Sequence, residues 1–345
     1  MSDGIENLLA LGGAVTFVFA AVTSAALIIA SLPWLERYAL ARPNARSSHR
    51  TPTPQGGGIA VIVATMGATG VAFGFFPLDV SPGSPLPMIV AVSVMMACVG
   101  VIDDVRPLAV GPRLLLQAVA VAGIIYTLPD HLRVVPLLPW WVERILLLIG
   151  GLWFVNLVNF MDGIDWMTVV EVVPLTATLA IIGAEGALPS YGTVIARALC
   201  GAMIGFAYFN RPTARLFLGD VGSLPIGLIL GWLLLLLASG GHVVAALVMP
   251  LYYLADATIT LMRRLGRGEL IWQAHRTHFY QRAIDRGFTT TEVVARVFVV
   301  NLGLCALALT LVTVSAPTRL SQIAALLGGA MLVVWLLVAF ARGKR

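Results

Sequence analysis

The chain has 345 residues, of which 59% are hydrophobic and only 11% are charged, and its formal net charge is +5. Soluble globular proteins carry about 25% charged residues, so this composition excludes a soluble domain and predicts a polytopic integral membrane protein. The three cysteines lie inside apolar runs at spacings that match no metal motif, and we interpret them as core residues.

Eleven apolar runs are long enough, or nearly long enough, to cross a bilayer, which takes about 20 residues of helix. They are 8–32, 57–76, 87–102, 111–128, 142–160, 168–184, 193–209, 224–239, 242–262, 291–314 and 320–341. The first run follows MSDGIEN, which lacks the basic residues of a signal peptide, so we expect a retained helix. We therefore predict one all-α transmembrane domain over residues 1–345, with about 11 transmembrane helices.

The distribution of positive charge sets the expected orientation. Of the 22 Lys and Arg residues, 17 fall in one set of alternate loops and Arg296 lies beside that set, which leaves four elsewhere. Because basic loops stay on the cytoplasmic side, we predict an outside N-terminus and a cytoplasmic C-terminus. The cytoplasmic loops are then about 33–56, 103–112, 160–168, 210–223 and 263–290.

The first two of these loops carry candidate ligand-binding residues. Residues 47–58 read SSHRTPTPQGGG, in which Ser48 and His49 offer hydrogen-bond donors and the glycines permit close approach to a ligand. An ordinary basic turn is the equally open alternative. The second loop begins with Asp103 and Asp104, which either bind a ligand or cap a helix end. Arg113 either holds a phosphate or marks the cytoplasmic side.

The next polar series consists of Asn156, Asn159, Asp162 and Asp165, which repeat at intervals of three. On a helix this spacing keeps the side chains roughly on one face. A hydrogen-bond network that stabilises the bundle would explain them. A ligand or metal site is the favoured interpretation, because two of the four residues are acids.

The last two polar breaks add an acid and a group of donors. FLGDVGS places Asp220 at the start of a helix, where the dipole favours an acid, and Phe217 could stack on a base. The loop 263–290 concentrates His275, Arg276 and His278, although contact with anionic headgroups is the alternative. Asp256 lies inside an apolar run and must have a partner or line a cavity.

The motifs SSHRTPTPQGGG, GVIDDV, NFMDGID and FLGDVGS, in this order, resemble the polyprenyl-phosphate N-acetylhexosamine-1-phosphate transferases over roughly residues 30–290. The resemblance implies transfer of a sugar 1-phosphate from a UDP-N-acetylhexosamine to undecaprenyl phosphate, with release of UMP. It implies Mg²⁺, or Mn²⁺ in its place, and an active site on the cytoplasmic face of the bacterial inner membrane. Membrane lipid is an expected partner, nucleic acid is not, and a homodimer stays open.

The same resemblance implies a role for each motif. Asp220 would ligate the metal with Asn159 as a second ligand, and Asp103, Asp104 and Arg113 would form the catalytic group. The residues expected to bind substrate are Asp162, Asp165, Phe217, Ser48, His49, His275, Arg276 and His278. A general-base role for Asp103 or Asp104 is a hypothesis only, because phosphoryl transfer depends mostly on positioning and electrostatics.

Two departures from the family pattern bear on specificity. Trp166 stands in DGIDW where the family has a glycine, and HRTHFYQR lacks the triple histidine of the enzyme that uses UDP-MurNAc-pentapeptide. The second departure argues against a peptidoglycan precursor and favours the subgroup that initiates O-antigen, in lipopolysaccharide biosynthesis, or another surface polysaccharide. Two other classes are alternatives: a transporter or lipid-linked sugar flippase, which predicts mid-bilayer polar groups and a repeated half, and a non-catalytic scaffold.

Overall fold

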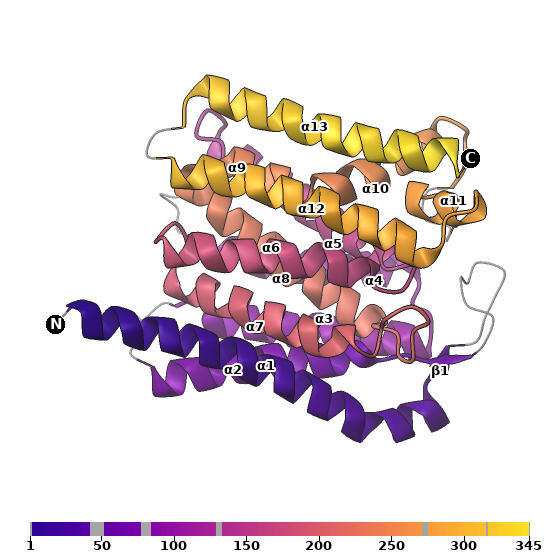
Figure 1. Cartoon of the computed structure of the whole chain (residues 1–345), viewed down its shortest axis with the longest axis horizontal. Coiled ribbons are helices and arrows are strands. Elements are labelled where there is room, and N and C mark those ends of the chain that lie inside the picture. The colour runs from indigo at the N-terminus through magenta and orange to yellow at the C-terminus, as the bar shows by residue number, and fades with distance from the viewer. Residues whose placement is uncertain are drawn as a thin grey trace.

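The computed structural model describes residues 2–41, 52–76, 84–128, 133–270, 275–314 and 317–344, with side chains from residue 11 onward. The described residues form a bundle of long helices that lie side by side (Figure 1), which confirms the all-α prediction. The helices are α1 (Ser2–Tyr38), α2 (Gly57–Phe75), α3 (Leu86–Val105), α4 (Val110–Tyr126), α5 (Trp140–Met161), α6 (Met167–Ala184), α7 (Ser190–Ala207), α8 (Asp220–Leu237), η1 (Ala238–His242), α9 (Val243–Val248), α10 (Leu251–Leu265), α11 (Phe279–Asp285), α12 (Thr290–Thr313) and α13 (Arg319–Arg342). A short antiparallel pair joins β1 (Leu40–Ala41) to β2 (Thr53–Pro54).

Within the described residues, nine helical segments are long and apolar enough to cross a membrane, and α4 is apolar but shorter. One of the nine, Asp220–Val248, joins α8 to α9 across a kink at Gly241, whose φ is 95°. The predicted run 242–262 is therefore not one continuous helix. It consists of α9 and α10, which are separated just before Leu251 at Pro250. Proline cannot donate a backbone hydrogen bond and its ring clashes with the preceding turn, which explains the break inside this predicted run.

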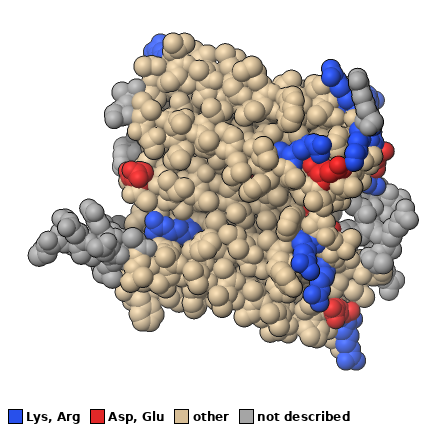
Figure 2. All heavy atoms as spheres, in the orientation of Figure 1, with Lys and Arg blue, Asp and Glu red and all other residues tan. Residues whose placement is uncertain are grey.

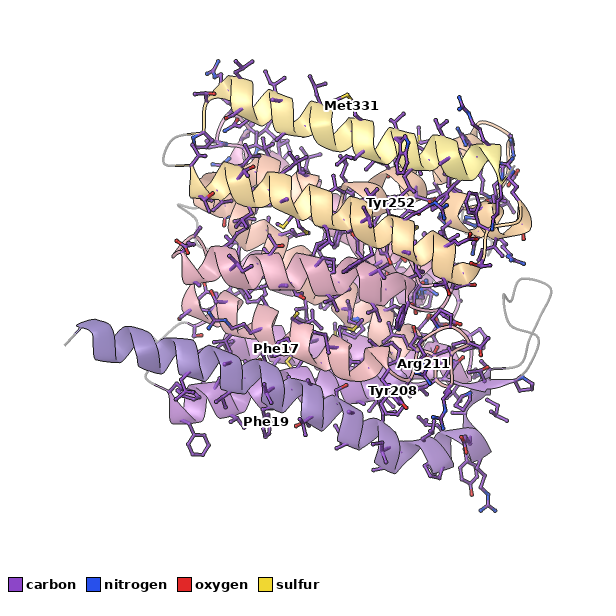
Figure 3. The ribbon with its side chains drawn as sticks, viewed as in Figure 1. Phe17, Phe19, Tyr208, Arg211, Tyr252 and Met331 are labelled. Carbon is purple, nitrogen blue, oxygen red and sulfur yellow. The ribbon has the colours of Figure 1, made fainter. Side chains whose placement is uncertain are left out.

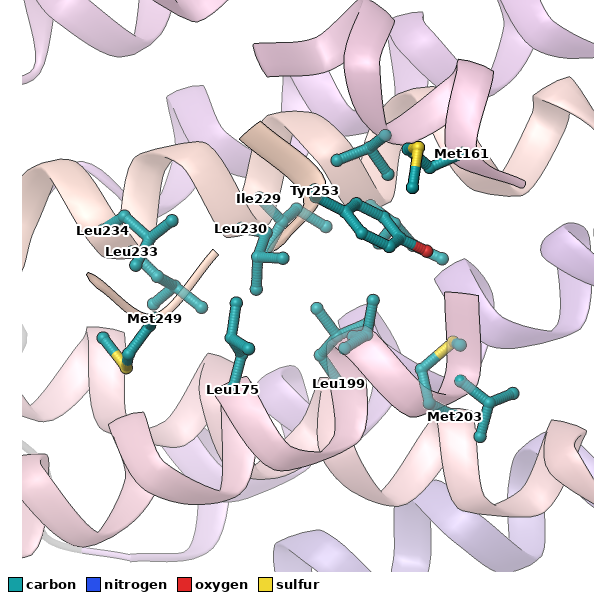
Figure 4. Close-up of a cluster of buried hydrophobic side chains, with 14 of the residues drawn as sticks. Met161, Leu175, Leu199, Met203, Ile229, Leu230, Leu233, Leu234, Met249 and Tyr253 are labelled. Atoms are coloured by element: carbon teal, nitrogen blue, oxygen red, sulfur yellow. The ribbon is translucent and has the colours of Figure 1, made fainter. Parts of the chain in front are cut away.

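The outer helices expose apolar side chains, as expected of surfaces that face lipid. Phe19 on α1 is 41% exposed and Met331 on α13 is 68% exposed (Figure 3). The interior is equally apolar: side chains from α5, α6, α7, α8 and α10 meet in one cluster that includes Met161, Leu175 and Leu230 (Figure 4). Because both faces are apolar, the few buried polar groups must find partners inside the bundle.

One such buried group compensates for a proline in α6. Pro174 lies inside this helix and has no N–H with which to bond the carbonyl of Val170, four residues earlier. Asn301 of α12 donates its side-chain amide to that carbonyl at 2.8 Å and to Glu171 at 2.7 Å. A neighbouring helix thus replaces the missing donor, which is how membrane helices tolerate proline.

Charged side chains gather at one end of the bundle. In Figure 2 most of the blue and red atoms lie at the right, where Figure 1 shows α11, β1 and the C-terminal end of α13. We call this the charged end. Asp220 at the start of α8 lies near the β1–β2 pair, because Phe217 pairs with Gln55, which follows β2. Asp104 near the end of α3 contacts the same start of α8. The end of α5, next to Asp162, contacts Tyr280 of α11.

Candidate active site

The acid motifs predicted from the sequence meet at the charged end. Asp104, in the last turn of α3, accepts the backbone N–H of Asp220 at 3.0 Å and that of Val221 at 3.1 Å. These N–H groups belong to the first turn of α8, where a helix has no backbone acceptors of its own. Gly219 has a φ of 77°, and a Cβ atom at this position would lie 2.6 Å from the Asp104 carboxylate. The glycine therefore permits Asp104 to cap α8.

Arg113, in the first turn of α4, connects the three motifs. It donates to Asp103 at 2.7 Å and to the side-chain oxygen of Asn159 at 3.3 Å, and it lies 3.8 Å from the carboxylate of Asp220. The other oxygen of Asp103 accepts the backbone N–H of Leu108 at 2.7 Å. Asp103 thus orients the guanidinium and stabilises the turn between α3 and α4.

The polar series at the end of α5 divides between two surroundings. Asn159 donates to Asp220 at 2.7 Å and to Ser223 at 2.9 Å, so it lies within the acid cluster. Asn156, one turn earlier, donates to Gln117 of α4 at 2.6 Å and is buried between helices. Asn156 therefore belongs to an interhelical hydrogen-bond network, whereas Asn159 lies among the acids of the candidate site.

A cavity of about 280 Å³ opens among these residues, and we call it the acid pocket. Four carboxylates line it, and among the described residues that line it there is no Lys or Arg. The lining residues are Gln55, Asp104, Asn159, Asp162, Gly163, Ile164, Asp165, Asn210, Phe217, Leu218, Gly219, Asp220 and Gln281. Six predicted site residues thus share one cavity: Asp104, Asn159, Asp162, Asp165, Phe217 and Asp220.

The turn between α5 and α6 forms one wall of the acid pocket. Asp162 accepts a hydrogen bond from Thr168, and burial, reinforced by the nearby carboxylates of Asp104 and Asp165, raises the pKa of Asp162 to about 7. Asp165 accepts the backbone N–H of Ala214 at 2.9 Å. Asp165 therefore holds the loop 208–219 to this turn as well as lining the pocket.

Trp166 occupies a backbone conformation that favours glycine. Its φ is 64°, in the left-handed region, which non-glycine residues seldom adopt. Its indole N–H donates to the carbonyl of Ala207 at 2.6 Å, and its backbone N–H donates to Asn210 at 2.8 Å. The tryptophan thus adopts a backbone conformation that glycine would adopt more easily, and its side chain forms a hydrogen bond to the end of α7.

Two residues that sequence reasoning missed connect the loops around the acid pocket. Asn210 accepts from Trp166 and donates to the carbonyl of Leu216 at 2.9 Å, and no motif or spacing distinguished it. Gln55 pairs with Phe217 in a β-bridge, and the backbone N–H of Phe217 donates to Pro54 at 2.8 Å. The end of the segment 47–58 therefore reaches the site, whereas Ser48 and His49 lie outside the described residues.

The predicted donors His275, Arg276 and His278 do not line the acid pocket. His278 is buried, and its Nδ1 lies 3.2 Å from Asp256, which confirms that this acid has a partner. His275 contacts Arg264 and stacks on His278 with ring centroids 4.9 Å apart. Arg276 pairs with Asp285 at 3.1 Å. Their predicted contacts with substrate remain predictions.

The oxygen donors of the acid pocket fit a hard divalent cation in chemical type. Within the described residues, no three His, Cys, Asp or Glu side chains are placed to hold a metal ion by themselves. Mg²⁺ is commonly bound by only one or two carboxylates, with substrate phosphates and water completing the octahedron. The residues present therefore suit a Mg²⁺ that arrives with a phosphorylated substrate.

Comparisons with known proteins match this part of the chain. The model of Glycosyl transferase family 4 matches residues 86–238, which include Asp103, Asp104, Asn159 and Asp220. The chain is 28% identical over 296 residues to the decaprenyl-phosphate N-acetylglucosaminephosphotransferase of Mycobacterium tuberculosis, covering 75% of this chain and 72% of that protein. It is 23% identical over 305 residues to the probable undecaprenyl-phosphate N-acetylglucosaminyl 1-phosphate transferase of Bacillus subtilis, covering 83% and 82%.

A third relative is similar over a shorter stretch. The chain is 31% identical over 175 residues to the phospho-N-acetylmuramoyl-pentapeptide-transferase of Gluconacetobacter diazotrophicus. This match covers 45% of the chain and spans about half, 47%, of that relative. All three relatives are named for the transfer of a phosphorylated sugar, and the first two names specify a polyprenyl phosphate.

Proposed function

We propose that the chain transfers a sugar 1-phosphate from a UDP-N-acetylhexosamine to undecaprenyl phosphate. The premise is that the chain belongs to the superfamily that the Glycosyl transferase family 4 model describes. A phosphate oxygen of the lipid attacks the β-phosphorus of the donor, the bond from that phosphorus to the bridging oxygen breaks, and UMP leaves. The products are undecaprenyl-diphosphate-sugar and UMP. The observation that carries the proposal is a pocket lined by four carboxylates, beside which Arg113 is hydrogen-bonded to Asp103 and Asn159.

Both substrates are anions, so the site must reduce their repulsion. Asp220, with 29% of its side chain exposed, and Asn159 beside it would hold Mg²⁺ or Mn²⁺. When bound, the cation would neutralise the diphosphate and improve UMP as a leaving group. Arg113 would place positive charge where negative charge develops on the phosphate oxygens in the transition state. Asp103 keeps the guanidinium oriented for that role.

An apolar groove of about 310 Å³ between α4, α5, α8, α9 and α10 supports a lipid acceptor. Its lining includes Val155 and Gly227, which are one turn from Asn159 and two turns from Asp220 along their helices. A prenyl chain in this groove would have its phosphate near the acid pocket. The nucleotide would enter the pocket from water, where Phe217 offers a ring for stacking.

The positive charge of the loops supports a cytoplasmic active site in a bacterial inner membrane. The HRTHFYQR segment favours initiation of a surface polysaccharide such as O-antigen over peptidoglycan synthesis. A flippase would require polar groups along a path through the bilayer. The acids instead collect at the charged end, which favours the transferase.

The test is release of UMP by purified protein in detergent with Mg²⁺, undecaprenyl phosphate and a panel of UDP-N-acetylhexosamines. Asp220→Asn is the matched control, because it keeps the size of the side chain and removes its charge. We expect Mg²⁺-dependent UMP from one donor and a rate at least about 100-fold lower in the control, as for loss of a major electrostatic contact. No UMP from any donor, with protein that melts cooperatively, would contradict the proposal.

A further inference from the structure

We propose that Asp256 is a positioning residue for the donor side of the acid pocket: it holds the first turn of α11 against the turn at Gly163 and thereby places Gln281 in the pocket wall. Gln281 would then contact the donor substrate. The inference rests on the proposed function, and it concerns an aspartate on α10 that lies outside all the acid motifs.

Asp256 is fully buried, and both of its oxygens accept hydrogen bonds from α11. One oxygen accepts the backbone N–H of Phe279 at 3.0 Å and lies 3.2 Å from the ring nitrogen of His278. The other accepts the backbone N–H of Tyr280 at 3.2 Å and the hydroxyl of Tyr252 at 3.1 Å. A buried carboxylate persists only when it is fully hydrogen-bonded. Tyr252 belongs to α10 itself, so the backbone donors of Phe279 and Tyr280 are the ones that fix the start of α11 on α10.

The start of α11 in turn presses on the α5–α6 turn. The hydroxyl of Tyr280 donates to the carbonyl of Phe160 at 3.1 Å. A Cβ atom on Gly163 would lie 2.1 Å from that hydroxyl, so the tyrosine occupies the space that a side chain at 163 would need. Gly163 is part of the pocket wall and is adjacent to Asp162. A displacement of α11 would therefore reach the pocket directly.

Gln281 is the residue of α11 that lines the acid pocket. Its side-chain oxygen accepts the backbone N–H of His278 at 3.3 Å, so the amide is oriented by the same turn that Asp256 holds. The amide nitrogen lies near Gly163, 3.0 Å from where a Cβ atom would stand. In a pocket lined by four carboxylates, a neutral amide offers a hydrogen-bond donor for a phosphate or sugar oxygen of the UDP-sugar.

The kinetic experiment compares Asp256→Asn with Gln281→Ala. An asparagine can accept from only one of the two groups of donors, so the turn should loosen. We expect each variant to raise KM for the UDP-sugar about 5- to 20-fold and KM for undecaprenyl phosphate less than about twofold. The double variant should be no worse than the poorer single variant, because residues that act through one contact are not additive. Equal effects on both KM values, or additive effects, would overturn the proposal.

A second experiment needs no turnover, so it separates failure of this inference from failure of the proposed function. Gln281→Cys is introduced with Cys98→Ser, since Cys98 is exposed while Cys200 and Cys305 are buried. Its reaction with a water-soluble maleimide should quicken at least fivefold when Asp256→Asn is added. Tyr280→Phe, which removes only the hydroxyl to Phe160, should quicken it as well and serves if Asp256→Asn does not fold. Tyr252→Phe is the matched control and should leave the rate unchanged. Rates within twofold of one another in all variants would refute the positioning role.

Discussion

Replacement of Asp104 by asparagine tests whether this carboxylate positions α8 or acts as a general base. Its two oxygens accept the N–H groups of Asp220 and Val221, and an asparagine would turn an amide NH₂ toward one of these donors. A hydrogen bond to a charged group contributes about 1.5–3 kcal/mol, and a charge at a helix N-terminus about 0.3–1 kcal/mol. A loss of about 2–3 kcal/mol in the placement of Asp220 corresponds to a rate about 30- to 150-fold lower.

The assay is UMP release under saturating substrates between pH 6 and pH 9, with the melting temperature of the variant as the control for folding. A positioning role predicts a uniform reduction, with the shape of the pH–rate profile unchanged. A general base is required in its ionised form, so its removal would abolish the acidic limb of the profile. Loss of that limb, or activity within threefold of wild type, would refute the assignment of Asp104 as the cap of α8.

Two further predictions concern residues that support the site. Asn301→Leu should destabilise the protein by about 1–3 kcal/mol, because it leaves buried acceptors unsatisfied. In a Pro174→Ala background the cost should be about 0.6–1.7 kcal/mol smaller, because residue 174 can then donate to the carbonyl of Val170. Equal costs of Asn301→Leu in both backgrounds, measured by unfolding in SDS, would contradict this compensation. Trp166→Gly should melt at a higher temperature than Trp166→Ala, because a left-handed backbone costs alanine about 1 kcal/mol that glycine avoids; the reverse order would show that φ at 166 is not strained.

The sequence was sufficient for the helices but not for the break in the α8–α10 region. Hydropathy identifies apolar runs, and most of these runs form continuous helices of the expected length. Pro250 was visible inside the run 242–262, yet hydropathy averages over it. The kink at Gly241 depends on a left-handed backbone that a window of apolar residues does not encode. Local backbone conformation, not hydrophobicity, therefore decides where this apolar run breaks.

The acid cluster was predictable because a charged side chain near hydrocarbon requires a reason. Neutral residues give no such signal: Asn210 and Gln281 enter the acid pocket only through the packing of distant loops. The same limit applied to Asp256, whose need for a partner was predicted but whose partners on α11 were not. Sequence patterns identify the expensive groups, and tertiary contacts determine which of them bind substrate and which hold the structure.

The contacts of the aspartates indicate different roles for them. Asp103 is bonded to Arg113 and Leu108, Asp104 to the first turn of α8, and Asp165 to Ala214. Asp220 differs, since 29% of its side chain is exposed, against 7% for Asp103. The guanidinium of Arg113 lies 3.8 Å from its carboxylate, beyond hydrogen-bond distance. A carboxylate that must bind an incoming cation needs open coordination sites, whereas one that braces a helix needs them filled. Loss of Asp220 should therefore abolish the response to Mg²⁺, while loss of Asp103 or Asp104 should lower the rate and leave that response in place.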